Sequence, residues 1–261
     1  KPEKFIDWIY WKLGTKIAEN YMIPYNQKMF NKSLNQLGTY WVEKLPNVSF
    51  EETLLSCLMK KAYGKQPGHA QFYYPKKYGY GELWLRMAEN VKENIEYNSV
   101  VNSIDFDTKT VRTADGKKYQ AQVIITTIPW MEFREIKGMP NDIVQSIGKL
   151  KYSSIQTKYY SANMDTDSHW IYYPDKALSY HRILVRHNFC PNSKGYWTET
   201  NSERIDAKDN DQNFKYMNQY AYPLNTIGKR ELMKKLLDWS RSMDVIGVGR
   251  WGEHQHYNSD V

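Results

Sequence analysis

Cysteine is scarce in this sequence, and long apolar runs are absent. Cys57 and Cys190 are its two cysteines, which argues against a disulfide scaffold and favours a reducing compartment. No apolar run approaches the roughly 20 residues that a membrane-spanning helix needs. The opening residues, KPEKFIDW, contain no apolar segment of the kind found in a signal peptide. The sequence therefore predicts a cytoplasmic protein without a membrane span.

Several self-contained catalytic motifs are also missing. The sequence contains no G-x-S-x-G, H-E-x-x-H, Walker or C-x-x-C motif. Near its end, His254 and His256 lie two residues apart, and with Glu253 or Asp260 they make up a nitrogen and oxygen set suited to a metal ion. The remaining histidines have no complementary spacing, so the sequence predicts no metal site.

Positive charge is in excess, but it is not concentrated. The net charge is +7 at pH 7, and a basic protein attracts anions. The lysines occur as scattered pairs and form no basic stripe, so no nucleic-acid partner is expected. Aromatic residues are abundant, with 22 tyrosines and 9 tryptophans. Their rings can stack on sugars and bases while their polar tips form hydrogen bonds, although most are expected to fill a core.

The first 66 residues predict a helical subdomain. Apolar residues recur at every fourth position over 5–21, and Pro24 is expected to end that helix. Two further helices are expected over 33–45 and 49–63, each behind a serine that is suited to cap it.

The pattern then changes to strands. The Asp115-Gly116 pair predicts a hairpin, and VIITTIP, at 123–129, is apolar throughout, as strands covered on both faces are. A helix opening on a glycine turn is expected at 81–91, and another over 232–243. Short strands are expected over 70–75, 94–98, 100–107, 110–113 and 119–129. Longer aromatic strands of an antiparallel sheet are expected over 152–162, 169–174, 179–186 and 195–200. A loop is expected over 203–216, and a final strand and turn over 244–251.

Five segments of the sequence occur in a characteristic order, at residues 5–30, 70–84, 123–129, 169–182 and 249–260. Their most specific parts are P-Y-N-x-K, W-x-Y-Y-P followed by an arginine, and G-R-W-G. In this order the segments resemble the flavin-dependent UDP-galactopyranose mutases of the wider flavin amine oxidase and protoporphyrinogen oxidase superfamily.

The resemblance implies an α+β flavoprotein fold. Family members carry an N-terminal β-α-β unit with a glycine fingerprint for FAD, and a C-terminal helix against the flavin. The sequence starts after the first and stops before the second, so the expectation is an internal fragment that does not bind FAD alone. The implied parts are a helical substrate subdomain (1–66), a remnant of the Rossmann-like FAD domain (67–140), an antiparallel-sheet substrate domain with helices (141–248) and the start of a C-terminal FAD-contacting segment (249–261).

The implied activity is the interconversion of UDP-galactopyranose and UDP-galactofuranose for surface polysaccharide synthesis. The chemistry takes place through an adduct of the sugar with the flavin N5, so no side chain is expected to be catalytic. Arg182 and Arg250 match the positions that bind the diphosphate. The other matched substrate contacts are Tyr172, Tyr222, Trp170, Asn26, Tyr21 and Phe30. The matched flavin contacts are Gly79, Gly81, Pro129 and Asp260.

Some positions depart from the family pattern. Phe189 stands where a phosphate-binding tyrosine is expected, and His256 replaces another tyrosine. Lys44 is a candidate for a further family arginine. These departures leave the sugar of the substrate open.

Two other functions remain open. One is an oxidase of amines or porphyrinogens, against which the paired arginines argue because they suit an anionic substrate. The other is a non-catalytic binder of nucleotide sugars. For the mutase reaction the expected partner is a UDP-sugar. Exposed sheet edges would favour a homo-oligomer.

Overall fold

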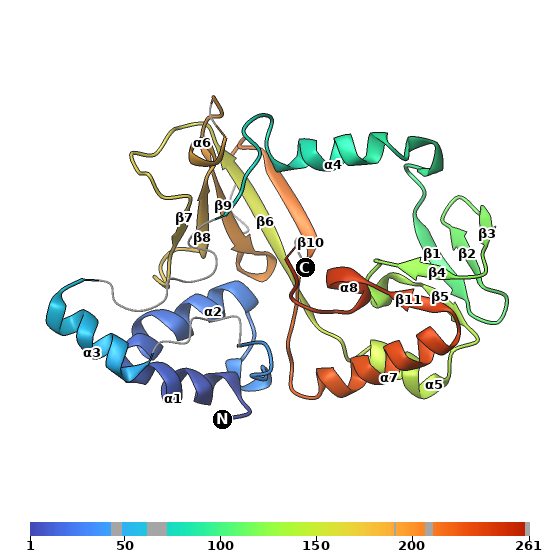
Figure 1. Ribbon diagram of the computed structural model, residues 1–261, viewed down its shortest axis with the longest axis horizontal. Coiled ribbons are helices and arrows are strands. Elements are labelled where there is room, and N and C mark those ends of the chain that lie inside the picture. Colours follow the sequence, from blue (N-terminus) through green and yellow to red (C-terminus); the bar gives the residue numbers. More distant parts are fainter. Residues whose placement is uncertain (43–48, 62–71, 191, 207–210, 259–261) are drawn as a thin grey trace.

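The computed structural model describes residues 1–42, 49–61, 72–190, 192–206 and 211–258 (Figure 1). Within these ranges, its mixture of helices and sheets confirms the α+β class. The helices are α1 (Phe5–Ile17), α2 (Ile23–Phe30), α3 (Phe50–Met59), α4 (Tyr80–Glu89), α5 (Asn141–Ile147), α6 (Arg186–Phe189), α7 (Lys229–Ser242) and α8 (Gly249–Gly252). The strands are β1 (Val101–Asp105), β2 (Thr110–Thr113), β3 (Lys118–Gln120), β4 (Ile124–Thr126), β5 (Glu135–Lys137), β6 (Tyr152–Tyr160), β7 (Trp170–Tyr172), β8 (Arg182–Val185), β9 (Tyr196–Asn201), β10 (Lys215–Pro223) and β11 (Val245–Gly247).

The N-terminal helices pack as one unit, but they divide differently from the prediction. α1 ends at Ile17, and a π-helical turn at Ala18–Met22 leads directly into α2. Pro24 lies in the first turn of α2, where a helix does not use the proline's missing N–H group. The expectation that Pro24 ends a helix is therefore wrong, because the proline begins the next one. Phe5 and Phe30 belong to the buried core of this unit.

The helix expected over 33–45 is wrong in the part that the structure describes. A 3₁₀ turn at Leu34–Gln36 is followed by extended backbone. The Leu37 carbonyl accepts a hydrogen bond from the Phe5 N–H at 2.8 Å, and the Gly38 N–H donates to the Asn225 carbonyl at 2.8 Å. The first bond holds this segment against the start of α1, and the second joins it to the residue that follows Leu224 after β10. A helix would have used both main-chain groups internally.

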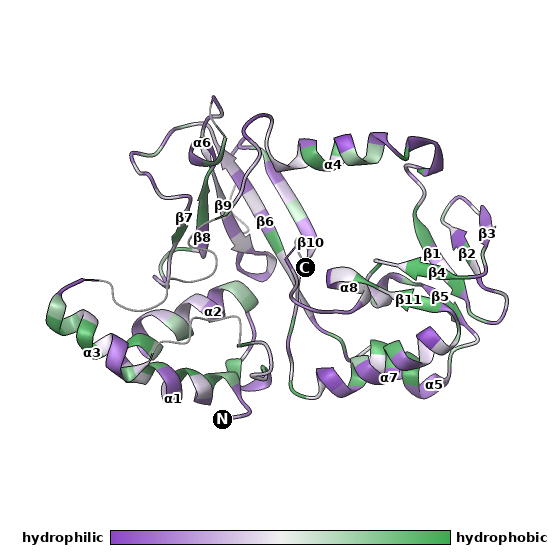
Figure 2. Ribbon diagram, viewed as in Figure 1, coloured by the Kyte–Doolittle hydropathy of each residue, from purple (hydrophilic) through white to green (hydrophobic). Residues whose placement is uncertain are grey.

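Helices α3 and α4 lie on the surface and bury none of their residues. The capping box of α3 is confirmed, since Ser49 Oγ accepts from the Glu52 N–H at 3.0 Å. The helix ends at Met59, and the predicted end at residue 63, before Gly64, lies outside the described residues. Neither α3 nor α4 has a buried residue, and both carry exposed apolar side chains, such as Phe50 at 80% exposure (Figure 2).

Short strands form the middle of the chain. β2 turns at Asp115-Gly116 into antiparallel β3, as predicted, while β1 pairs with β2 and with β5. The strands expected over 94–98 and 70–75 are wrong, because residues 94–98 and the described residues 72–75 are not in strands. β4 pairs only with β11 within its described two-stranded sheet, and Ile125 is 66% exposed. The expectation that VIITTIP is covered on both faces is therefore wrong.

Helices α5 and α7 cover this middle region. The helix predicted from its leucine spacing is α7, and Leu236 is buried. α5 and α7 share a core with β1 and β11, although the expected boundary at residue 141 assigns them to the sheet domain. The buried members of this core include Ile104, Phe106, Trp130, Ile143, Met233, Leu236 and Val245. By the criterion of length and apolar character, none of the helices in the described ranges could span a membrane.

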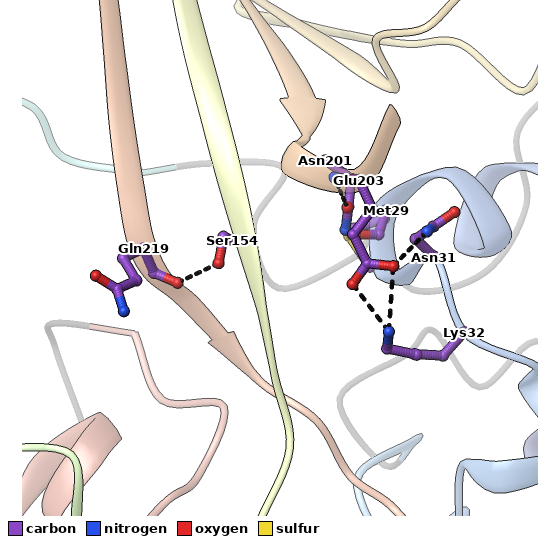
Figure 3. Close-up of polar contacts among 7 residues, drawn as sticks. All are labelled: Met29, Asn31, Lys32, Ser154, Asn201, Glu203 and Gln219. Atoms are coloured by element: carbon purple, nitrogen blue, oxygen red, sulfur yellow. Dashed lines mark hydrogen bonds and ion pairs between the residues drawn. The ribbon is translucent and has the colours of Figure 1, made fainter. Parts of the chain in front are cut away.

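The largest sheet has the strand order β10-β6-β9-β8-β7. Four of its strands were predicted, and the fifth, β10, was missed. Between Asn218 and Tyr222 the register of β10 against β6 shifts, and Ser154 Oγ donates to the Gln219 carbonyl at 2.6 Å inside this bulge (Figure 3). A bulge redirects the side chains that follow it, and here the next paired residue is Tyr222.

Polar side chains fasten the helical unit to this sheet. Asn201, at the end of β9, donates to the Met29 carbonyl of α2 at 2.9 Å. Glu203 accepts from Asn31 at 2.7 Å and pairs with Lys32 at 2.9 Å (Figure 3). The joint places α2 beside the strands that carry the predicted substrate contacts.

Candidate functional site

One face of the large sheet carries a buried ion pair. Arg182 and Glu199 lie opposite each other on β8 and β9. Arg182 Nε donates to Glu199 Oε2 at 2.8 Å, and Nη2 lies 2.7 Å from the same oxygen. Nη2 also donates to the Tyr222 hydroxyl at 3.2 Å. Among the described residues, none accepts a hydrogen bond from Nη1, so this nitrogen retains two donors for a ligand.

The surroundings keep this pair charged. Burial alone would raise the pKa of the Glu199 carboxyl, but His181 and the Arg182 charge hold it below the usual range. Burial lowers the pKa of His181, whose Nε2 lies 3.5 Å from Glu199 Oε2. Burial also raises the pKa of Tyr222, which keeps its hydroxyl protonated at neutral pH. The cluster therefore contains a cation, a carboxylate and a neutral phenol.

Three tyrosines continue this surface. The Tyr21 and Tyr25 rings stack with centroids 5.9 Å apart, and Tyr172 meets Tyr25 edge-on at 5.5 Å. Tyr25 also touches the His181 ring at 5.9 Å, and burial raises its pKa. Tyr25 was not predicted as a site residue. Its position one helical turn after Tyr21 was the available signal, because residues four apart share a helix face.

Two of the predicted contacts on α2 point away from this surface. The Asn26 amide donates to the Met22 carbonyl at 2.7 Å and is buried. Phe30 lies in the helical core, edge-on to Trp41. The structure does not bring these two side chains into the tyrosine surface, and their roles as contacts stay predictions.

The lysine of the P-Y-N-x-K segment binds the main chain of a loop in the large sheet. Lys28 Nζ donates to the carbonyls of Tyr173 at 2.8 Å and of Asp175 at 2.7 Å. Both belong to the loop between β7 and β8. Burial lowers the pKa of Lys28 to about 8. The lysine therefore pins the loop that separates Tyr172 from Arg182.

Trp170 belongs to a separate aromatic cluster. Its ring lies edge-on to Phe189 at 4.9 Å and is tilted against Phe72 at 5.1 Å. Phe189, where a tyrosine was expected, also contacts His169 and Tyr74. The phenylalanine thus fills a cluster with its ring and has no hydroxyl to offer a ligand.

The second predicted arginine lies in the segment 249–258, here called the C-terminal arm. Arg250 Nε and Nη2 donate to the Tyr257 carbonyl at 2.9 and 2.6 Å, and Nη1 donates to the Ala221 carbonyl at 3.0 Å. Its guanidinium carbon lies 5.8 Å from the centroid of the Tyr222 ring. Arg182 and Arg250 therefore flank the same phenol.

The two histidines of the arm have different neighbours. The His256 ring lies parallel to Tyr222 at 5.0 Å and to Trp41 at 6.5 Å. His254 is fully buried, its Nε2 lies 3.0 Å from the Lys151 carbonyl, and burial lowers its pKa to about 4. Asp260 lies outside the described residues. Within the described ranges, no group of three His, Cys, Asp or Glu side chains is placed to hold a metal ion.

The predicted flavin contacts lie at turns. Gly79 has φ +80° and precedes α4 without a side-chain cap, and a Cβ on Gly81 would meet open space. The Tyr80 N–H donates to the Tyr74 hydroxyl at 3.3 Å. The other N–H groups of the first turn, beside the open Gly81, fit a flat cofactor that accepts hydrogen bonds. Pro129 follows β4 and precedes the buried Trp130. Each of these roles stays a prediction.

A glycine pattern that begins at the end of β11 and extends into the arm was not among the predicted motifs. Gly247, Gly249 and Gly252 form G-x-G-x-x-G between β11 and α8. A Cβ on Gly247 would lie 2.5 Å from the Gly252 carbonyl oxygen, and one on Gly252 would lie 2.4 Å from the Thr126 oxygen. The glycines thus let β4, β11 and α8 pack closely, which is one of the uses of this pattern.

Solved structures share this fold. A reduced UDP-galactopyranose mutase superposes with a TM-score of 0.85 at 20% identity over 97% of this chain and 62% of its own. A fatty acid isomerase from P. acnes gives 0.56 at 13% identity over 94% and 61%. A putrescine oxidase gives 0.51 at 12% identity over 93% and 51%. These identities show the fold alone, and the chain spans about three-fifths of the mutase.

The match to a family model covers half of the chain. Residues 26–160 match the family described as flavin containing amine oxidoreductase. This range includes Asn26, the glycine turn before α4 and strand β4, where the sequence predicts substrate and flavin contacts. The chain belongs to the flavin containing amine oxidoreductase family.

Proposed function

We propose that this chain is the substrate-binding part of a flavoenzyme that interconverts the pyranose and furanose forms of a UDP-sugar. The observation that carries the proposal is the pair of arginines on one phenol. Arg182 donates to the Tyr222 hydroxyl, and Arg250 lies over the same ring. Two cations beside neutral hydroxyl donors suit a diphosphate, since guanidinium groups bind phosphates through paired hydrogen bonds. The same cations would repel a protonated amine.

The side chains of the cluster have distinct roles in this proposal. Arg182 Nη1 binds the diphosphate, while Glu199 fixes the plane of the guanidinium. Tyr172 and Tyr25 add hydroxyl groups and flat surface beside it. Neutralising the diphosphate stabilises it as a leaving group, and that is how these residues assist the reaction.

Family membership implies a flavin, whose reduced form, when bound, supplies the nucleophile for the sugar. Gly79 and Gly81 would lie against it. The protein side of the reaction is therefore to bind the UDP-sugar, orient it and exclude water. A cytoplasmic location fits this role, because UDP-sugars are intracellular metabolites. Strands β7 and β10 form the ends of the large sheet, and pairing along either would give a homo-oligomer.

The test is a titration of this chain with UDP, followed by tryptophan fluorescence, with UMP and galactose as controls. Saturable quenching by UDP, weaker with UMP and lost in Arg182→Ala, is expected. A chain that is folded by circular dichroism yet indifferent to UDP would count against the site. The same titration with the intact flavoprotein would then separate a pocket that needs its flavin part from a wrong assignment.

The reaction itself needs the intact flavoprotein. Turnover of a UDP-sugar by the reduced enzyme, without consumption of oxygen, is expected. Oxygen consumption with an amine or porphyrinogen would identify an oxidase instead. Binding of UDP without any turnover would leave a nucleotide-sugar binder.

A further inference from the structure

Lys229, the first residue of α7, is fully buried. Its Nζ donates to Asn225 Oδ1 at 2.7 Å and to the His254 carbonyl at 2.6 Å, and Gln255 Oε1 lies 3.5 Å away. The ammonium also lies 5.4 Å from the centroid of the Tyr40 ring. Among the described residues, no carboxylate forms an ion pair with it.

A buried ammonium without a counter-ion is costly unless its hydrogen atoms are used. Here three N–H groups meet three neutral oxygens, which suits a lysine and would not suit the wider fork of an arginine. The acceptors come from separate segments. Asn225 follows β10, which carries Tyr222, whereas His254 and Gln255 belong to the C-terminal arm. The lysine therefore ties the arm to the end of the strand.

The two arm residues that reach Tyr222 lie on either side of this tie. Arg250 precedes it and bonds to the Ala221 and Tyr257 carbonyls. His256 follows it, with its ring between Tyr222 and Trp41. The His254 backbone, whose carbonyl Lys229 holds, has φ +50°, a conformation that a side-chain-bearing residue seldom adopts without support.

We propose that Lys229 is a positioning residue of the diphosphate site, which docks the C-terminal arm so that Arg250 and His256 pack on Tyr222. This inference rests on the proposed function for its ligand. Lys229 itself does not touch the ligand. It acts by fixing the main chain from His254 to Gln255, and the arm then presents the second arginine.

The experiment compares Lys229→Met with Leu236→Ala. Both side chains are buried on α7, but Leu236 lies in the core around β1 and outside the tie, so its variant controls for lost stability. Hydrogen exchange of the amides in 249–258 reports on the arm, and calorimetry gives the dissociation constant for UDP. Lys229→Met is expected to accelerate exchange in the arm at least tenfold and to weaken UDP binding about tenfold. Leu236→Ala is expected to change neither.

A double variant sharpens the test. If Lys229 acts through the arm, adding Lys229→Met to Arg250→Ala is expected to weaken UDP binding little beyond Arg250→Ala alone, because the two losses are coupled. Additive losses, or equal effects of Lys229→Met and Leu236→Ala on the arm, would overturn the proposal. Should neither the unaltered chain nor the intact flavoprotein bind UDP, the diphosphate assignment fails. Hydrogen exchange would still show whether Lys229 docks the arm.

Discussion

Arg182 and Arg250 approach the same tyrosine with different kinds of support. Arg182 projects from a strand, and its partners are side chains, Glu199 and Tyr222. Arg250 sits on the short helix α8, and its hydrogen-bond partners are the carbonyls of Ala221 and Tyr257. A strand arginine that is paired with a carboxylate depends on charge balance. An arginine that is bonded to main-chain oxygens depends on the fold of the arm. Substitutions of the two arginines should therefore differ in their effects on stability and UDP binding.

The largest effect is expected at Arg182. Arg182→Met leaves the Glu199 carboxylate buried without its cation, which should lower the free energy of unfolding by about 3–5 kcal/mol and abolish UDP binding. Urea unfolding and calorimetry measure the two. The control is the double variant Arg182→Met with Glu199→Gln, which should recover much of the stability and none of the binding. Unchanged stability in the single variant would show that the ion pair does not hold this end of the site.

At Arg250 the shape of the guanidinium should matter more for stability than its charge, so Arg250→Lys is the informative substitution. A lysine retains the charge but loses the fork that reaches both carbonyls, so a loss of about 2–3 kcal/mol in the free energy of unfolding is expected. Arg182→Lys is the matched control. The new lysine can still pair with Glu199, so the free energy of unfolding of this variant should fall less. Equal losses in the two lysine variants, measured by urea unfolding, would mean that the kind of support makes no difference.

The sequence singled out Arg182 and Arg250 because each lies in a motif with a recognisable neighbourhood. The structure places both beside Tyr222, and their role in binding stays a proposal. The sequence was not sufficient for their partners. Glu199 meets Arg182 only through the register of β8 against β9, which no local pattern encodes. The spacing of four from Tyr21 was a signal for Tyr25, but its contact with the His181 ring depends on how α2 packs against the sheet, which no local pattern encodes.

The errors in the fold have related causes. Pro24 was interpreted from its missing N–H group alone, but the same property suits the start of a helix. Residues 37–38 were expected to be helical, yet their main chain bonds to Phe5 and Asn225, which are distant in sequence. β10 was missed because an edge strand with a bulge has no regular alternation. Tertiary contacts overrode a local preference at residues 37–38, whereas the other two errors came from local features that were misinterpreted.

The arm should also respond to pH, whereas the Arg182 pair should not near neutrality. Burial lowers the pKa of Lys229 to about 7, while an unfolded lysine has a pKa near 10.5. Between these values the unfolded chain binds the additional proton, so stability rises with pH. Below pH 7 both states carry the proton and this contribution is constant.

The measurement is the difference in the free energy of unfolding between the unaltered chain and Lys229→Met at pH 6, 7, 8 and 9. The difference should grow with pH above 7 by about 1 kcal/mol per unit, near the limit for one proton. The other groups close to Lys229 do not interfere. His254, with its pKa lowered to about 4, titrates below this window, and burial raises the pKa of Tyr40 above it. Lys28, with its pKa of about 8, is present in both proteins. A difference independent of pH would contradict the lowering of the Lys229 pKa by burial.

The smallest effect is expected at the tyrosine that the two arginines share. Tyr222→Phe keeps the ring, so the contacts with Arg250 and His256 persist, while Arg182 loses one acceptor. Removing one hydrogen bond to a charged group should cost about 1–2 kcal/mol of stability and a few-fold in UDP affinity. Tyr172→Phe is the control for stability alone, since the hydroxyl of Tyr172 has no hydrogen bond to either arginine among the described residues. If Tyr222→Phe instead released the arm, as seen by faster hydrogen exchange in 249–258, the hydroxyl would link the two ends. Arg182 on β8 and Arg250 in the arm would then not be supported independently.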